Sequence, residues 1–127
     1  IMPITLIYAG TMALLSVLLA NYVLYIRLRA KGLPDWQPHA AERVQSNFTE
    51  NVPLGLIVLY LVEVAGAPGW FIHSSGIALV LLRLAHAYGL ARYEGANYPR
   101  LIGAQGTFVL LAVLGMTAIL LSLRGSS

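Results

Sequence analysis

The chain has 127 residues, of which 58% are hydrophobic and only 10% are charged, whereas charged residues make up about 25% of ordinary soluble domains. A water-soluble globule of this size has too much surface for so few charges, and so apolar a chain is not a disordered one. The net charge of +3 comes from eight basic and five acidic residues. These charges are too sparse to form the basic stripe of a nucleic-acid-binding protein. The sequence contains no cysteine, which excludes disulfides, thiolate metal sites and a cysteine nucleophile within it. The composition therefore predicts an integral membrane protein.

Three segments are long and apolar enough to cross a membrane: Ile4–Ile26, Trp70–Leu90 and Leu101–Leu123. Each contains 21 to 23 residues, and at ~1.5 Å per residue each crosses a hydrocarbon core of about 30 Å. A fourth span is less clear, because its wholly apolar part, Val52–Val62, has only 11 residues. Extended to residues 45–67 it is long enough, and the turn-forming stretch 65–69 (AGAPG) then joins two crossings. The sequence predicts an all-α fold, a single four-helix membrane bundle over residues 1–127.

The basic residues next to the spans predict the orientation of the bundle. Four lie between the first and second spans (Arg27, Arg29, Lys31 and Arg43), and two lie between the third and fourth (Arg92 and Arg100). The connection between the second and third spans has none. By the positive-inside rule, both basic loops are expected on the cytoplasmic side and both termini on the opposite side.

In this topology the polar residues within the spans lie toward the cytoplasm. Arg43, Asn47 and Glu50 are spaced i, i+4 and i+7, so they share one face of the second span. Arg83 and His86, spaced i and i+3, share one face of the third span. An ionised group that faces lipid near the membrane centre costs at least ~2.5 kcal/mol, so both faces are expected to point into the bundle. We therefore expect the two faces to meet, with Glu50 and Arg83 as natural partners.

Two interpretations of this meeting point remain open. Glu50 and Arg83 can form a buried ion pair that only fixes how the helices pack. However, further cationic or titratable groups are expected at the same level: Arg27, Arg43, His86 and Arg100. They leave a surplus of positive charge, which favours a site for an anionic ligand.

Two further patterns bear on packing and on metals. Gly103 and Gly106 in the fourth span, and Ala85 and Gly89 in the third, are small residues at helical spacing that suit close packing within or between subunits. His73 and His86 are 13 residues apart, roughly 20 Å along a helix, so they cannot share one metal ion. No ligand cluster for a metal is expected.

Three short motifs, in order along the chain, resemble those of one family. Residues 27–31 (RLRAK) resemble the basic end of its first helix, residues 43–53 (RVQSNFTENVP) its second-helix signature, and residues 83–86 (RLAH) its third-helix motif. This is the MAPEG family, the membrane-associated proteins in eicosanoid and glutathione metabolism. The resemblance covers essentially the whole chain, since length and number of spans also agree.

The resemblance implies a homotrimer that binds glutathione, as co-substrate, between neighbouring subunits near the cytoplasmic face. The positions expected to bind glutathione are Arg27, Arg43, Asn47, Glu50, Arg83 and His86. Arg100 resembles the arginine thought to stabilise the thiolate. The chain departs from the prostaglandin synthase branch in two places, because Leu90 stands where that branch has a tyrosine and no serine follows Arg100. The resemblance thus implies generic glutathione chemistry.

The expected function is that of a membrane-embedded glutathione-dependent transferase or peroxidase that acts on lipophilic electrophiles. The expected location is a bacterial inner membrane or an endomembrane, in contact with lipid. One alternative is a non-catalytic member of the same fold that binds a lipid or glutathione. Another is a small proton-coupled multidrug transporter, but such a protein needs a carboxylate in the middle of its first span, where this chain has only Asn21.

Overall fold

The structure is a computed structural model that describes residues 2–92 and 97–125. These residues form four α-helices: α1 (Thr5–Leu28), α2 (Trp36–Val64), α3 (Gly69–Arg92) and α4 (Tyr98–Gly125). A short 3₁₀-helix, η1 (Ala30–Gly32), lies between α1 and α2. No strand occurs in the described ranges. The all-α fold class predicted from the sequence is confirmed.

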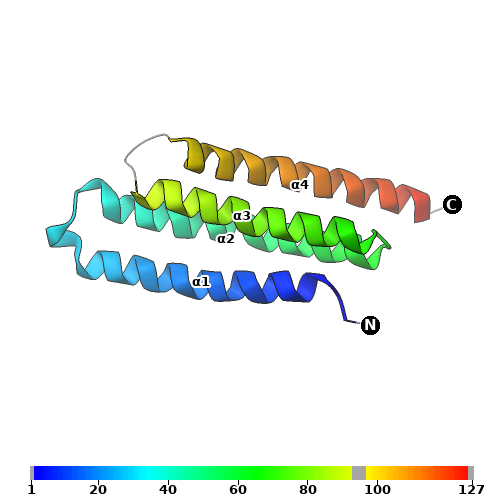
Figure 1. The fold of residues 1–127 in the computed structure, drawn as a ribbon, viewed down its shortest axis with the longest axis horizontal. Coiled ribbons are helices and arrows are strands. Elements are labelled where there is room, and N and C mark those ends of the chain that lie inside the picture. Colours follow the sequence, from blue (N-terminus) through cyan, green and yellow to red (C-terminus); the bar gives the residue numbers. More distant parts are fainter. Residues whose placement is uncertain (1, 93–96, 126–127) are drawn as a thin grey trace.

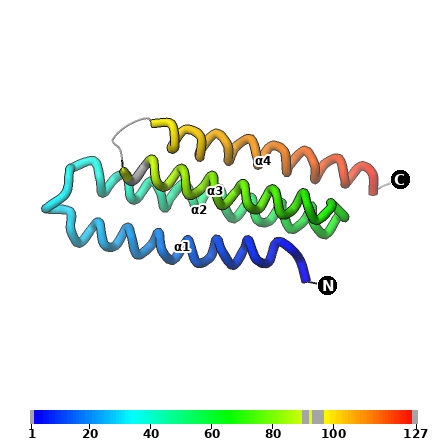
Figure 2. The backbone as a smooth tube through the Cα atoms, viewed as in Figure 1, coloured from blue at the N-terminus to red at the C-terminus, as the bar shows by residue number. Residues whose placement is uncertain are grey.

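The four helices form an up-and-down bundle in which sequential helices are antiparallel neighbours (Figure 1). Helices α2 and α3 lie in the middle, with α1 packed on one side and α4 on the other. The contact between α3 and α4 is the most extensive of the bundle, followed by that between α1 and α2. The start of α1 and the end of α4 lie at one end of the bundle, and η1, the end of α3 and the start of α4 lie at the other (Figure 2). We call these the terminal end and the loop end.

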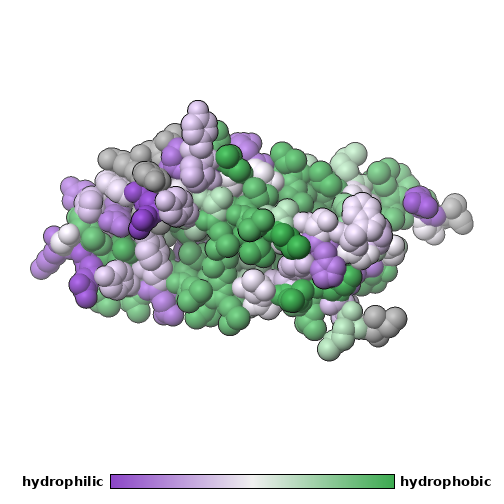
Figure 3. Space-filling view, in the orientation of Figure 1, coloured by the Kyte–Doolittle hydropathy of each residue, from purple (hydrophilic) through white to green (hydrophobic). Residues whose placement is uncertain are grey.

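The outer surface of the bundle is largely apolar. Many large hydrophobic side chains are exposed on all four helices, among them Leu14, Leu61, Leu81 and Met116. Figure 3 shows hydrophilic side chains gathered mainly at the loop end, and an apolar band over the middle of the face that it draws. Such a surface suits lipid and not water.

Three of the helices are apolar and long enough to cross a membrane: α1, the stretch Gly69–Gly89 of α3, and α4. Helix α2 is not among them, and its first half carries many polar residues. It nevertheless connects the loop end of α1 to the terminal end of α3, so it runs the same length of the bundle. Its inner face is apolar and includes Val44, Phe48, Val52, Leu59 and Val62.

Glycines in α4 bring it very close to α3. A Cβ atom placed on Gly103 would lie 2.5 Å from the Cβ of His86 and 2.6 Å from the carbonyl oxygen of Leu82. A Cβ on Gly106 would overlap the Leu82 side chain. The expectation that these two glycines serve close helix packing is confirmed for packing within the chain.

At the start of α4, Asn97 caps the helix, since its Oδ1 accepts a hydrogen bond of 3.0 Å from the Arg100 backbone N–H.

Helix α1 begins against a carboxylate from α2. Glu63 Oε1 accepts hydrogen bonds from the backbone N–H of Thr5 (2.8 Å) and from the Thr5 hydroxyl (2.7 Å). The other oxygen of Glu63 accepts from the backbone N–H of Ile4. The first turn of a helix leaves such N–H groups without partners and carries partial positive charge, so this carboxylate stabilises the start of α1. Beside it, the Tyr8 hydroxyl and His73 Nδ1 are 2.7 Å apart.

Candidate functional site

Arg83 lies at the centre of a polar cluster inside the bundle, in the half nearer the loop end. The residue is only 2% exposed, although it is carried by a largely apolar helix. Its Nη2 donates a hydrogen bond of 2.5 Å to Asn47 Oδ1 on α2. Its Nη1 donates one of 3.3 Å to the hydroxyl of Thr107 on α4, and that hydroxyl in turn donates to the Gly103 carbonyl at 2.6 Å. The guanidinium thus joins three helices.

No carboxylate neutralises this guanidinium within the part of the chain that the structure describes. The partners of Arg83 are the amide of Asn47, the hydroxyl of Thr107 and, at a long 3.5 Å, the Nδ1 atom of His86. The Nε atom of Arg83 is buried and has no hydrogen-bond partner. A buried cation with only neutral partners is costly, because the loss of hydration is not compensated by an opposite charge. The cluster is therefore suited to an anion.

A second asparagine extends the cluster along α2. The Asn51 Nδ2 group donates to the backbone carbonyl of Asn47 at 2.8 Å and to Asn47 Oδ1 at 3.2 Å. Asn47 Oδ1 therefore accepts from both Arg83 and Asn51. Asn47 and Asn51 are both partly exposed, so they lie between the buried cation and the surface of the bundle.

His86 and two further arginines complete the positive region. His86 is 4% exposed and lies one helical turn after Arg83. The positive charges of Arg43 and Arg100 both interact electrostatically with its ring. The position of Arg100 is fixed by the cap of α4, because Asn97 binds the Arg100 backbone and also donates from its Nδ2 to the Gly89 carbonyl of α3 at 2.9 Å. The structure thus brings Arg43, Asn47, Arg83, His86 and Arg100 to one region.

The expected pairing of Glu50 with Arg83 is wrong. Arg83 binds Asn47 instead, and Glu50 is exposed on the outer face of α2. Asn47 faces α3 because Val44 and Phe48, its neighbours on the helix surface, are buried in the core. Glu50 lies on the side of α2 away from these residues, where it lines a shallow groove of about 310 Å³ with Gln45, Ser46 and Thr49.

Arg27 is bound to a residue that the sequence did not single out. Its Nε and Nη2 atoms donate to Glu42 Oε1 at 3.1 and 2.8 Å. Both side chains are largely exposed, at 60% for Arg27 and 47% for Glu42, so this ion pair contributes little to stability. It links the loop ends of α1 and α2.

Three residues of this region were missed at the level of sequence: Glu42, Asn51 and Thr107. Thr107 looks like an ordinary residue of an apolar span, but it stands one turn after Gly103 and so on the face that meets α3. Asn51 stands one turn after Asn47 and could have been found from that spacing. The side chain of Leu90 lies outside the described part. Among the residues that are described, no group of three or more His, Asp or Glu is arranged to hold a metal ion.

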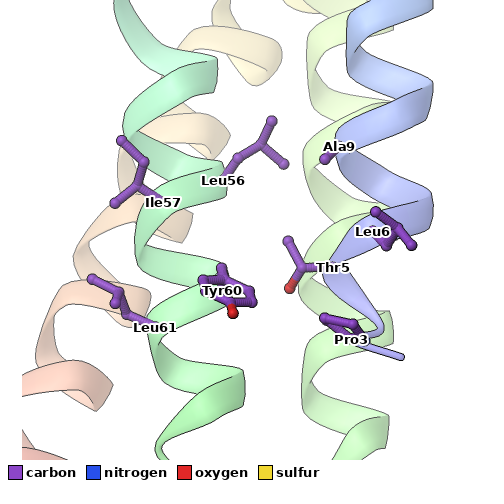
Figure 4. Close-up of a pocket in the computed structure, with 8 residues that line it drawn as sticks. All are labelled: Pro3, Thr5, Leu6, Ala9, Leu56, Ile57, Tyr60 and Leu61. Atoms are coloured by element: carbon purple, nitrogen blue, oxygen red, sulfur yellow. The ribbon is translucent and has the colours of Figure 1, made fainter. Parts of the chain in front are cut away.

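An apolar groove of about 310 Å³ lies between α1 and α2 at the terminal end, away from the polar cluster. Figure 4 shows its walls, which Leu6 and Ala9 form on α1 and Leu56, Ile57 and Leu61 form on α2. Among the described residues that line it, Thr5 and Tyr60 are polar and none is charged. None of these lining residues is cationic, so the polar cluster around Arg83 is the candidate site for an anion.

Comparison with known families identifies the family of this four-helix chain. The sequence profile of the MAPEG family matches residues 5–120. The chain belongs to the MAPEG family. This match confirms the family resemblance carried by the three motifs. Together with the inner membrane relatives, it also confirms the prediction that the chain is an integral membrane protein.

Two curated relatives are similar to this MAPEG chain. Both are named inner membrane protein YecN, one from Escherichia coli strain K12 and one from Escherichia coli O6:H1. Each is 30% identical over 89 residues, which cover 65% of this chain and 66% of the relative. The chain thus spans about two thirds of the length of these relatives. No solved structure gave a significant match.

Proposed function

We propose that this MAPEG chain is a glutathione-dependent transferase or peroxidase that acts on lipophilic electrophiles from within the membrane. The observation that carries the proposal is the buried guanidinium of Arg83, which has neutral partners only and an unpaired Nε atom. Such a centre favours an anionic ligand at the mouth of the cluster. Glutathione has two carboxylates, and it is the ligand that family membership suggests.

The chemistry of the surrounding residues suits this tripeptide. Arg27 and Arg43 are exposed at the loop end, where guanidinium groups can hold carboxylates in two-pronged hydrogen bonds. Glu50, also exposed, can accept from the ammonium group. Arg83 supports the site through Asn47, and His86 lies beside it. Arg100 is assigned to the thiol, because a nearby guanidinium favours the thiolate and makes the sulfur nucleophilic near neutral pH.

The proposed reaction needs no group beyond glutathione and the electrophile. In transfer, the thiolate sulfur forms a bond to an electrophilic carbon and the leaving group departs with its electron pair. In the peroxidase reaction, two glutathione molecules are oxidised to the disulfide while a hydroperoxide is reduced to an alcohol and water. The apolar second substrate enters sideways from the lipid, since the helices around the cluster face the membrane.

The exposed position of the polar face of α2 supports a trimer. Arg43 and Glu50 lie on the surface of the isolated chain, where an ionised group is costly if lipid covers it. A neighbouring subunit over this face would enclose glutathione between two chains. We further propose that the loop end, with its arginines and lysine, faces the cytoplasm and that both termini lie on the other side.

The test is a glutathione titration of the purified protein, followed by the absorbance of the thiolate, with turnover of an electrophilic aromatic halide measured in parallel. We expect a thiolate signal that saturates with glutathione, and glutathione-dependent turnover. Binding without a thiolate signal and without turnover of several acceptors would reject catalysis in favour of a non-catalytic binding protein. Absence of binding would reject the proposal.

A further inference from the structure

The side-chain amide of Asn47 is held from two directions. Arg83 Nη2 donates to its Oδ1 from α3, at 2.5 Å, and Asn51 Nδ2 donates to the same atom from the next turn of α2, at 3.2 Å. An amide oxygen has two lone pairs, so both are used. Arginine can only donate hydrogen bonds, which means that Asn47 must present its oxygen, and not its nitrogen, to Arg83.

This arrangement leaves the nitrogen of the amide available. Asn47 Nδ2 has no hydrogen-bond partner in residues 2–92 and 97–125, and Asn47 is partly exposed. The torsion that turns an asparagine amide about its last bond is broad, so one hydrogen bond to the oxygen does not fix the amide plane. A second donor from another direction does. Asn51 therefore determines where the two N–H groups of Asn47 point.

We propose that Asn51 is a positioning residue that fixes the amide of Asn47 as a hydrogen-bond donor to an oxygen of bound glutathione. This inference rests on the proposed function, which supplies the ligand. It assigns a role to a residue outside the motifs, since Asn51 acts through Asn47 and does not itself touch the ligand. It also predicts selectivity, because a fixed N–H donor favours a carboxylate or carbonyl oxygen and disfavours a donor group at that place.

A purely structural role for Asn51 makes a different prediction. Asn51 Nδ2 also donates to the Asn47 backbone carbonyl at 2.8 Å, a bond that stabilises the helix locally near Pro53. Serine makes the same kind of bond to the carbonyl four residues earlier, but its shorter side chain does not reach the Asn47 amide oxygen. Asn51→Ser thus keeps the structural bond and removes the positioning one, whereas Asn51→Ala removes both.

The experiment is a double-mutant cycle measured as the dissociation constant of glutathione, by calorimetry on the full chain in detergent. The variants are Asn51→Ala, Asn51→Ser, Asn47→Ala and Asn47→Ala with Asn51→Ala. Loss of one well-placed hydrogen bond weakens binding by about 3- to 10-fold, and we expect this loss for both Asn51 variants. The double variant should bind no more weakly than Asn47→Ala, because Asn51 has no effect once the amide is gone. Asn51→Ser keeps the kind of bond that Asn51 makes to the Asn47 backbone carbonyl, so its unfolding temperature should stay unchanged.

The matched control is Thr11→Ala, which removes a 2.8 Å bond from a side chain to the carbonyl four residues earlier, on α1 and outside the polar cluster. It should bind glutathione like the unmodified chain. If Asn51→Ser binds normally while Asn51→Ala does not, Asn51 only stabilises the helix and the inference is overturned. Additive losses in the double variant overturn it as well, because they indicate a direct contact with the ligand. If the unmodified chain binds no glutathione, the proposed function itself fails.

Discussion

Arg83 on α3 donates a 2.5 Å hydrogen bond to the side-chain oxygen of Asn47 on α2, a residue 36 positions earlier in the chain. This bond joins a buried cation to a partly exposed amide, and it connects the interior of the bundle to the face on which Arg43 and Glu50 lie. In a membrane bundle, a guanidinium that meets only neutral groups lowers stability, so its presence points to function rather than packing.

The first prediction follows from this cost. Replacing Arg83 by methionine removes a buried charge that lacks a carboxylate partner, and methionine fills an irregular gap well. We expect Arg83→Met to keep or raise the unfolding temperature of the ligand-free protein and to weaken glutathione binding by at least about tenfold. Thermal unfolding in detergent and calorimetric binding measure the two effects.

Arg124→Met, which removes a charge at the terminal end, is the control for Arg83→Met and should bind glutathione normally. A fall in the unfolding temperature with unchanged binding would make Arg83 a packing residue.

A second prediction concerns the contact between α3 and α4. A methyl group on Gly103 would lie 2.5 Å from the Cβ of His86, where backbone and not a flexible side chain must move. We expect Gly103→Ala to destabilise the protein by about 1–3 kcal/mol, as overpacking does. Because α4 carries Arg100 and Thr107, the variant should also weaken glutathione binding.

Gly115 is the matched control for Gly103, since it lies in the same helix with nothing within 4 Å of an added methyl group. Gly115→Ala should stabilise the protein by about 0.5–1 kcal/mol, because alanine favours the helix more than glycine does. Both changes are read from unfolding in detergent. Equal effects of the two substitutions would contradict the close approach of α4 to His86.

A third prediction separates the two ends of the bundle. Glu63 accepts two backbone hydrogen bonds and one hydroxyl bond at the start of α1, with both of its oxygens engaged. In Glu63→Gln one oxygen becomes an NH₂ group, which cannot accept, and the negative charge at the helix start is lost. We expect a loss of about 1–2 kcal/mol in stability with unchanged glutathione binding. Glu42→Gln, which removes an exposed ion pair, should cost less than about 1 kcal/mol. Weaker glutathione binding by Glu63→Gln would contradict a site confined to the loop end.

Much of this architecture could be predicted from the sequence. Three long apolar segments predicted three of the helices, and the turn at 65–69 both indicated the fourth and marked where α2 ends and α3 begins. The meeting of Asn47 with Arg83 also follows from the sequence, because residues near the same end of adjacent antiparallel helices lie at one level. Depth along a helix is given by counting residues, and this information is carried by the sequence alone.

Rotation of each helix about its axis could not be predicted in the same way. Arg43, Asn47 and Glu50 share one broad face, and the spacing does not tell which of the three meets α3. Packing of Val44, Phe48 and Val52 against the neighbouring helices decides this, and it turns Asn47 inward and Glu50 outward. The hydroxyl of Thr107 was missed for the same reason, since its role depends on how closely Gly103 lets α4 approach α3.

The last prediction distinguishes Arg100 from Arg43, which lie in the same positive region but are assigned different tasks. If Arg43 only holds a carboxylate, Arg43→Ala raises the dissociation constant of glutathione and leaves turnover at saturation unchanged. This is expected when binding is lost equally from ground and transition states.

If Arg100 stabilises the thiolate, Arg100→Ala raises the pKa of the bound glutathione thiol by about 1 to 3 and lowers kcat at pH 7 roughly ten- to a thousandfold. Activity should then recover at high pH, because a thiol with a pKa of about 8.5 ionises there without help. The pH dependence of kcat for the two variants measures the difference. An unchanged rate and pH profile in Arg100→Ala would mean that the arginine extends to the lipid headgroups as an anchor, and its catalytic role would have to be withdrawn.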